Sequence, residues 1–115
     1  MVVDQRPGAE LSVEQVDRIF HALADSTRRD ILRRSMAGPL SVSELAAAYD
    51  MSFAAVQKHV AVLEGAGLVT KEPDGRKRLV NGNPETLAEA QVLIDAYEQI
   101  WRDRVHRLDA LFADD

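Results

Sequence analysis

The segment from Ser41 to Arg78 restricts the fold of this chain more than any other part of the sequence. It begins with a capping box, in which the Ser41 hydroxyl and the Glu44 carboxylate can satisfy free backbone N–H groups at the start of a helix. Apolar residues at helical spacing continue this helix to Tyr49, and a turn at residues 50–52 follows. Ser52 can cap a second helix that is expected to run to about residue 64. Two short helices joined by a tight turn predict a helix-turn-helix.

The residues after the second helix predict a β-hairpin with a basic tip. Residues 65–67, Gly-Ala-Gly, can end the helix, and strands at 68–71 and 78–80 can pair across a turn at 73–75. Residues 71–78 contain four Lys and Arg against two Asp and Glu. A basic hairpin alone is more often a solvated surface, but behind a helix-turn-helix it suits a phosphate backbone or a minor groove. The segment therefore predicts a winged helix that binds DNA.

The second helix, residues 52–64, has an outward face suited to a major groove, because its apolar stripe leaves small, polar and cationic side chains on the other side. Gln57 could pair with adenine, and Lys58 could bind guanine or a phosphate. Phe53 is either a contact for a thymine methyl group or a plug under the turn, and His59 is either a DNA ligand or a packed histidine. The candidate DNA contacts are Ser52, Phe53, Ala54, Gln57, Lys58, His59, Arg76, Lys77 and Arg78.

Two further amphipathic helices are predicted before the helix-turn-helix. Ser12 begins a second capping box, and Val16 and Phe20 belong to the apolar stripe of the helix that follows it. Asp25 or Ser26 can cap the next helix. Four arginines on that helix are more typical of a solvated face than of DNA contacts.

The last predicted helix, residues 84–112, has apolar side chains spaced by threes and fours along its length. At 1.5 Å per residue it is on the order of 40 Å long, more than a small core can cover. Either it folds back on its own domain with Trp101 in the core, or it packs against a second copy, and its length favours a two-fold dimer. The candidate dimerisation residues are Val16, Phe20, Leu87, Ile94, Tyr97, Trp101 and Leu108.

Five segments resemble the ArsR/SmtB type of bacterial winged-helix repressors, and they occur in the expected order and at the expected distances. They are FHALADSTRRDIL (20–32), GPLSVSELA (38–46), AVQKHV (55–60), LEGAGLV (63–69) and GRKR (75–78). The resemblance implies a mainly α fold of five helices and a two-stranded wing that dimerises through its terminal helices. It also implies a repressor of its own operon, bound to an inverted-repeat operator and released by an effector. Arg28 and Arg29 belong to a structural signature of the family.

Length and composition favour one domain. The 115 residues, 46% of them hydrophobic, can bury one core and are too few for two domains. Residues 1–10 are expected to form a flexible tail, so that residues 11–115 make up the winged helix. The absence of cysteine excludes disulfides and thiolate chemistry. No segment has the length of a membrane span and no signal peptide opens the chain, so we expect a cytoplasmic protein without a membrane partner.

The net charge of −5 is unexpected for a DNA-binding chain, but the charge is segregated. Residues 26–80 carry nine Lys and Arg against six Asp and Glu, whereas residues 81–115 carry three against eight. Residues 1–25 carry two against five. The predicted DNA-binding segment is therefore positive and the remainder acidic, which predicts modest non-specific affinity.

The sequence predicts no enzymatic activity and no cofactor, because it has no glycine-rich phosphate loop and its three histidines fall on three different helices. His106 and Asp109, with Asp95 or Asp103 nearby, could supply metal ligands, but one imidazole among surface carboxylates is a weak zinc site. We therefore expect no metal site. A metal-responsive repressor and a winged helix that binds only proteins are the alternatives, and the resemblance leaves room for a small-molecule or ion effector.

Overall fold

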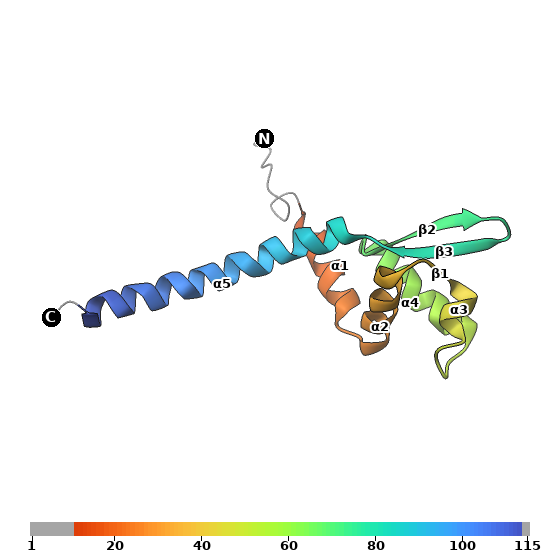
Figure 1. Ribbon diagram of the computed structural model, residues 1–115, viewed down its shortest axis with the longest axis horizontal. Helices are drawn as coiled ribbons and strands as arrows, with labels where there is room; N and C mark the ends of the chain where they lie inside the picture. Colours follow the sequence, from red (N-terminus) through yellow and green to blue (C-terminus); the bar gives the residue numbers. More distant parts are fainter. Residues whose placement is uncertain (1–10, 114–115) are drawn as a thin grey trace.

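The computed structural model describes residues 11–113, which form a winged helix followed by one long helix (Figure 1). The predicted tail, residues 1–10, lies outside the described residues. In chain order the elements are α1 (Val13–Leu23), α2 (Ser26–Ala37), β1 (Leu40–Ser41), α3 (Val42–Ala46), α4 (Phe53–Gly65), β2 (Val69–Asp74), β3 (Lys77–Gly82) and α5 (Pro84–Ala113). The fold is mainly α, and the five predicted helices are confirmed.

The helices begin where the sequence places their caps. Ser12 and Ser41 each form a complete capping box, with Gln15 and Glu44 as the reciprocal partners. Asp25 caps α2 through the Arg28 backbone N–H, so the first of the two predicted caps is the one used. Ser52 caps α4 by accepting a hydrogen bond from the Ala55 N–H at 3.1 Å. These bonds fix the starting point of every helix before the wing.

The end of α4 is set by Gly67, which adopts a positive φ of 76°. Its N–H donates to the Glu64 carbonyl at 2.9 Å, and the Leu68 N–H donates to the Leu63 carbonyl at 3.0 Å. This is a Schellman motif, which needs a left-handed residue that glycine adopts without strain. The predicted helix end at residues 65–67 is confirmed, and the chain leaves it directly into β2.

The sheet has three antiparallel strands in the order β1-β3-β2, one strand more than the predicted hairpin. The additional strand, β1, pairs Leu40 with Val80 and Ser41 with Leu79. The predicted turn at residues 73–75 ends one residue early, because Asp74 pairs with Lys77 and leaves only residues 75–76 in the loop. Gly75 stands first in this two-residue loop with φ of 62°, as a tight hairpin requires. Pro73 is tolerated because β2 is an edge strand.

The core joins all of these elements except the distal part of α5. Its largest fully buried side chains come from α1 to α4 and from the strands and the loop before β2, and they are Ile19, Ile31, Leu45, Val56, Val60, Leu63, Leu68, Val69 and Val80. Tyr49 was expected in the first helix of the helix-turn-helix but lies in the turn after α3, because that helix ends at Ala46. The buried residues of α4 are Val56, Val60 and Leu63, and the opposite face of this helix is exposed to solvent.

Helix α5 leaves the body of the protein soon after it begins and projects far beyond it (Figure 1). Ala90 is its one buried residue within the described chain. The molecule measures 70 × 37 × 22 Å, and its radius of gyration of 18.8 Å exceeds the roughly 13 Å expected for a compact chain of this length. Across residues 11–113, no helix is long and apolar enough to cross a membrane. Residues 84–112 therefore form the predicted long helix, and most of it extends away from the other elements that the structure describes.

Candidate nucleic-acid interface

A groove of about 290 Å³ lies between the start of α3, the start of α4 and the wing formed by β2 and β3. It brings together five of the predicted DNA contacts, two from α4 and three from the hairpin tip. The lining residues are Ser41, Val42, Ser43, Phe53, Gln57, Lys71, Arg76, Lys77 and Arg78. Residues separated by more than twenty positions in the sequence thus form one cationic concave surface.

The N-terminal half of α4 presents its predicted contacts to solvent. Phe53 is 47% exposed and lines the groove, so it does not plug the turn. Ala54, Gln57 and Lys58 are exposed on the same half of the helix. Ser52 is also exposed, and its hydroxyl oxygen caps the helix. This face could insert side chains into a major groove without first unpacking the core.

Ser43 and Lys71 line the groove but were not among the predicted contacts. Lys71 had a signal in the sequence, because it belongs to the basic run at residues 71–78. Its Nζ lies 3.9 Å from a Glu64 carboxylate oxygen, a contact that holds the side chain near the base of the wing. Ser43 had no signal, since its exposure at the groove depends on the way α3 packs beside the hairpin.

His59 is partly buried and lies on the flank of α4 that faces α2. Its Nδ1 is 3.4 Å from Nη1 of Arg28 and 3.9 Å from Oδ2 of Asp25. The contacts favour the packed reading of this histidine, although its side chain keeps 23% exposure on the recognition helix. The Arg28 backbone N–H, which donates to the capping Asp25 carboxylate, and the nearby Arg28 guanidinium lower the pKa of Asp25 below its ordinary value.

The arginines of α2 are engaged within the chain. Arg28 donates to the carbonyls of Ala22 and His21, both at 2.9 Å, and Arg29 donates to the Leu23 carbonyl at 2.8 Å. The His21 carbonyl also accepts from the Ala24 N–H at 3.2 Å, and the two arginines add side-chain donors to the last carbonyls of α1, so they cap that helix. This role agrees with the structural signature expected for them and not with a DNA contact.

A second cluster ties the turn after α3 to α2. The Tyr49 hydroxyl donates to Asp30 at 2.5 Å, and Arg33 and Arg34 bind the same carboxylate at 2.6 and 2.8 Å. The bonds from Arg34, Tyr49 and Arg33 hold the pKa of Asp30 well below its usual range. Burial and the hydrogen bond to Asp30 raise the pKa of Tyr49 to about 12. Because Arg34 also stacks over the Tyr49 ring, the turn that aims α4 is fixed to the core.

Large apolar side chains are exposed on α1 and α5. Tyr97 and Trp101 are 62% and 60% exposed, so the alternative in which Trp101 fills the core is wrong. The other predicted dimerisation residues divide into exposed ones and ones half-buried against the body. Phe20, Ile94 and Leu108 are exposed, whereas Val16 and Leu87 are half-buried.

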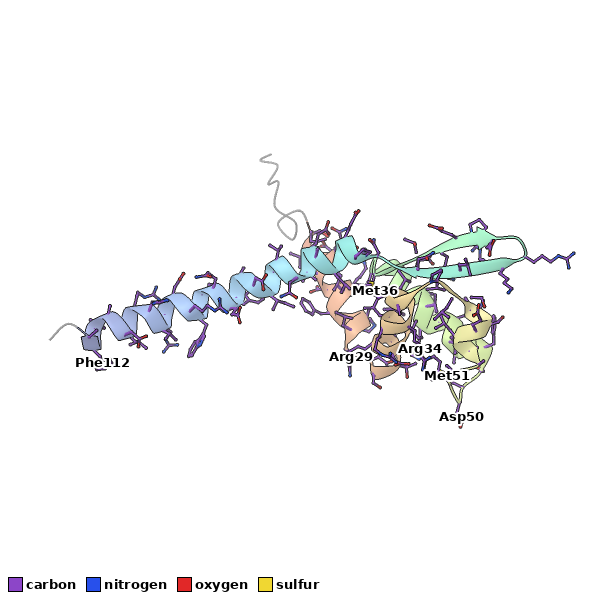
Figure 2. All side chains as sticks on the ribbon, viewed as in Figure 1. Arg29, Arg34, Met36, Asp50, Met51 and Phe112 are labelled. Atoms are coloured by element: carbon purple, nitrogen blue, oxygen red, sulfur yellow. The ribbon has the colours of Figure 1, made fainter. Side chains whose placement is uncertain are left out.

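Further apolar residues on this side were missed by the predicted set. A groove of about 390 Å³ between α1 and α5 is lined by Leu11, Val13, Val16, Asp17, Leu93 and Tyr97. Beyond it, Figure 2 shows α5 running to Phe112 with side chains all around the helix and no other element beside it. The additional exposed residues are Val13, Ile100, Val105, Leu111 and Phe112. A surface of this extent normally marks an interface.

No group of three or more His, Cys, Asp or Glu side chains that could hold a metal ion occurs within residues 11–113. His106 lies on the exposed part of α5, where it lines a shallow groove with Trp101 and Val105.

The fold and the groove define a winged helix of the kind that binds DNA. A family described as a helix-turn-helix domain matches residues 23–72. The HTH-type transcriptional regulator Rv2034 of Mycobacterium tuberculosis is 42% identical over 81 residues, which cover 70% of this chain and 76% of the relative. The chain therefore belongs to the ArsR-type family of winged helix-turn-helix transcriptional regulators.

Two solved structures agree with this assignment. The crystal structure of an ArsR family transcriptional regulator, RHA00566, is 35% identical with a TM-score of 0.74, covering 80% of this chain and 95% of that one. The solution structure of the homodimeric winged helix-turn-helix DNA-binding domain of Mb0332 from Mycobacterium bovis is 26% identical with a TM-score of 0.61. That match covers 85% of this chain and 91% of the Mb0332 domain.

Proposed function

We propose that this protein is a homodimeric repressor that binds an inverted-repeat operator, including the operator of its own operon. The observation that carries the proposal is the groove in which α4 and the basic wing converge. Helix α4 enters the major groove, and the wing lies on the backbone or in the adjacent minor groove. Helix α4 and the wing lie on the same face of the protein, so a single operator half-site can contact both.

The roles of the residues follow from their chemistry and exposure. Gln57 offers an amide that can pair with adenine, and Phe53 offers an apolar surface for a thymine methyl group. Lys58, Arg76 and Lys77 supply charge for phosphates, with Lys58 also within reach of guanine. The other proposed DNA contacts are Ser52, Ala54, His59 and Arg78. The small Ser52 and Ala54 side chains allow the start of α4 to approach the bases closely.

Dimerisation through α1 and α5 explains why α5 is so long and so exposed. The free face carries Ile94, Tyr97, Trp101, Val105 and Leu108 at intervals of three and four residues, the spacing of a helix-packing seam. A second copy related by a two-fold axis covers this face with the same face of its own. Two recognition helices held in this way lie about one DNA turn apart, which an inverted repeat requires. The homodimeric state of the Mb0332 domain supports this arrangement.

The experiment that tests the proposal combines sedimentation with footprinting. Sedimentation velocity of the full chain should show a dimer. Hydroxyl-radical footprinting on DNA upstream of its own coding sequence should show two protected half-sites separated by about one helical turn. A dimer without any protected site would support the protein-binding alternative, and a single protected half-site would contradict the two-fold model.

A further inference from the structure

The Arg28 side chain joins the end of α1 to the recognition helix. Its Nε donates to the Ala22 carbonyl and its Nη2 to the His21 carbonyl, both at 2.9 Å. The remaining nitrogen, Nη1, lies 3.4 Å from Nδ1 of His59. One guanidinium thus contacts two carbonyls of α1 and a ring of α4, and Arg28 and His59 are 31 positions apart in the sequence.

This contact determines where the neutral His59 ring carries its hydrogen. A guanidinium has only donors, so Nδ1 can bond to Arg28 only as an acceptor. The hydrogen must then be on Nε2. Asp25, the carboxylate near the ring, would favour a hydrogen on Nδ1, but it is 3.9 Å away and its Oδ2 already accepts from the Arg28 backbone N–H at 3.0 Å.

His59 lies at a position on α4 where an N–H group could donate a hydrogen bond to DNA. It follows Lys58 directly and lies between the exposed and the packed faces of α4, with its side chain 23% exposed. When a helix enters a major groove, its flanks run beside the phosphates, and phosphate oxygens accept hydrogen bonds but never donate them. A ring with its hydrogen on Nδ1 would present only an acceptor to such an oxygen.

We propose that Arg28 is a positioning residue for DNA binding: it holds His59 in the Nε2–H form, so that the ring donates to a DNA phosphate. The proposal deepens the proposed function and rests on the placement of α4 in the major groove. It also gives Arg28 two connected tasks, because the same guanidinium fixes the end of α1, the helix assigned to the dimer interface. The position of the His59 donor is thereby tied to the helix that meets the second copy.

The first test measures the tautomer directly and uses no DNA. Long-range ¹H–¹⁵N spectra of the full-length protein at a pH well above the ordinary histidine pKa of about 6.5 distinguish a protonated Nε2 from a protonated Nδ1. In the wild type we expect His59 to be wholly in the Nε2–H form. Arg28→Met should release it into a mixture of both tautomers, and Arg28→Lys, which keeps a donor, should restore much of the preference.

Arg29→Met is the matched control, because Arg29 also caps α1 but does not touch His59. It should lower thermal stability to a similar degree and leave the tautomer unchanged. A wild-type ring protonated on Nδ1 would overturn the proposal, as would a tautomer that both methionine variants leave intact. If Arg28→Met does not fold, the wild-type spectrum and Arg28→Lys decide the question.

The second test asks whether the Nε2–H group meets DNA. Asn places its amide near the Nδ1 position of histidine and can accept from Arg28, whereas Gln places its amide near Nε2 and can donate to a phosphate. With a duplex enriched from random-sequence DNA by the wild-type protein, His59→Asn should bind roughly a hundredfold more weakly, since each protomer of the dimer loses one hydrogen bond to a charged group and each loss costs about tenfold. His59→Gln should lose less, and the salt dependence should stay the same in both, because a neutral ring releases no counterion.

Wild-type affinity in His59→Asn would overturn the contact with phosphate. Failure of the wild-type chain to enrich any duplex would instead refute the proposed function, while the tautomer measurement would still report on Arg28.

Discussion

Replacing Arg76 and Lys77 with alanine removes two of the four cationic side chains of the wing and should weaken DNA binding electrostatically. Both side chains are exposed and line the groove beside α4. A dimer has two wings, so the double substitution removes four cationic groups. Each neutralised phosphate contributes about 0.9 to the slope of log affinity against log salt, so the slope should become less steep by about 3.6. At about 0.1 M salt the same four contacts correspond to a loss of between three and four orders of magnitude in affinity.

Fluorescence anisotropy of a labelled operator duplex at several salt concentrations measures both quantities. The control is the double variant Arg18→Ala, Arg107→Ala, which removes the same charge from exposed helical positions that do not line the groove. The control should keep most of the slope, and both variants should still sediment as dimers. A wing variant with the slope of the wild type would show that Arg76 and Lys77 do not neutralise phosphates.

Three further changes test other parts of the structure. Trp101→Ala should raise the dissociation constant of the dimer at least tenfold, because a central aromatic side chain at an interface contributes about 2 kcal/mol or more. Sedimentation equilibrium measures this constant. A monomeric variant that binds the operator with full affinity would contradict the dimer model. Tyr49→Phe should lower the free energy of unfolding in urea by about 1.5 kcal/mol, because Asp30 loses a charge-assisted hydrogen bond. Because the folded state lowers the pKa of Asp30, the ionised carboxylate stabilises the protein above the ordinary aspartate pKa of about 3.9, and this stabilisation is lost as the pH falls below it. In urea titrations at several pH values, the free energy of unfolding of Tyr49→Phe should therefore fall less in acid than that of the wild type. Gly82→Ala should destabilise the protein by about 1 to 3 kcal/mol in thermal melts, because a Cβ there would lie 2.4 Å from Sδ and 3.0 Å from Cα of Met36.

Gly38→Ala is the control for the Gly82 prediction. A Cβ at Gly38 would have no atom within 4 Å, and its φ of 167° is extended backbone that alanine adopts. Equal melting temperatures for the two alanine variants would show that the close contact between residue 82 and Met36 does not cause the loss of stability in Gly82→Ala.

Local signals predicted the helices well, because each depends on residues close together in the sequence. The Ser12 and Ser41 capping boxes, the Ser52 cap and the glycine at the end of α4 all occupy their predicted places. Long-range pairing was harder to predict. Strand β1 has only two residues, and it forms because these residues pair with β3, about forty positions later in the sequence. A strand this short has no periodic pattern from which it could be predicted. The predicted hairpin turn ended one residue early, because register depends on which residues face each other across the two strands.

The composition of the candidate site was largely predictable, but its connections were not. Amphipathic spacing placed Gln57 and Lys58 on the free face of α4, and the basic run placed Arg76 in the wing. The bond between Arg28 and His59 could not be predicted, because it depends on how α2 packs against α4. The sequence left His59 between two roles, and the contact geometry shows how one residue could serve both.

The central claim is selective binding of a dimer to an operator. The measurement that tests it most directly is a fluorescence-anisotropy titration of the wild-type protein against DNA from its own promoter, with a scrambled duplex alongside, at two salt concentrations. We expect tighter binding to the promoter duplex, saturation at two chains per site and weaker affinity at the higher salt. Equal affinity for both duplexes, or saturation at one chain per site, would contradict this claim.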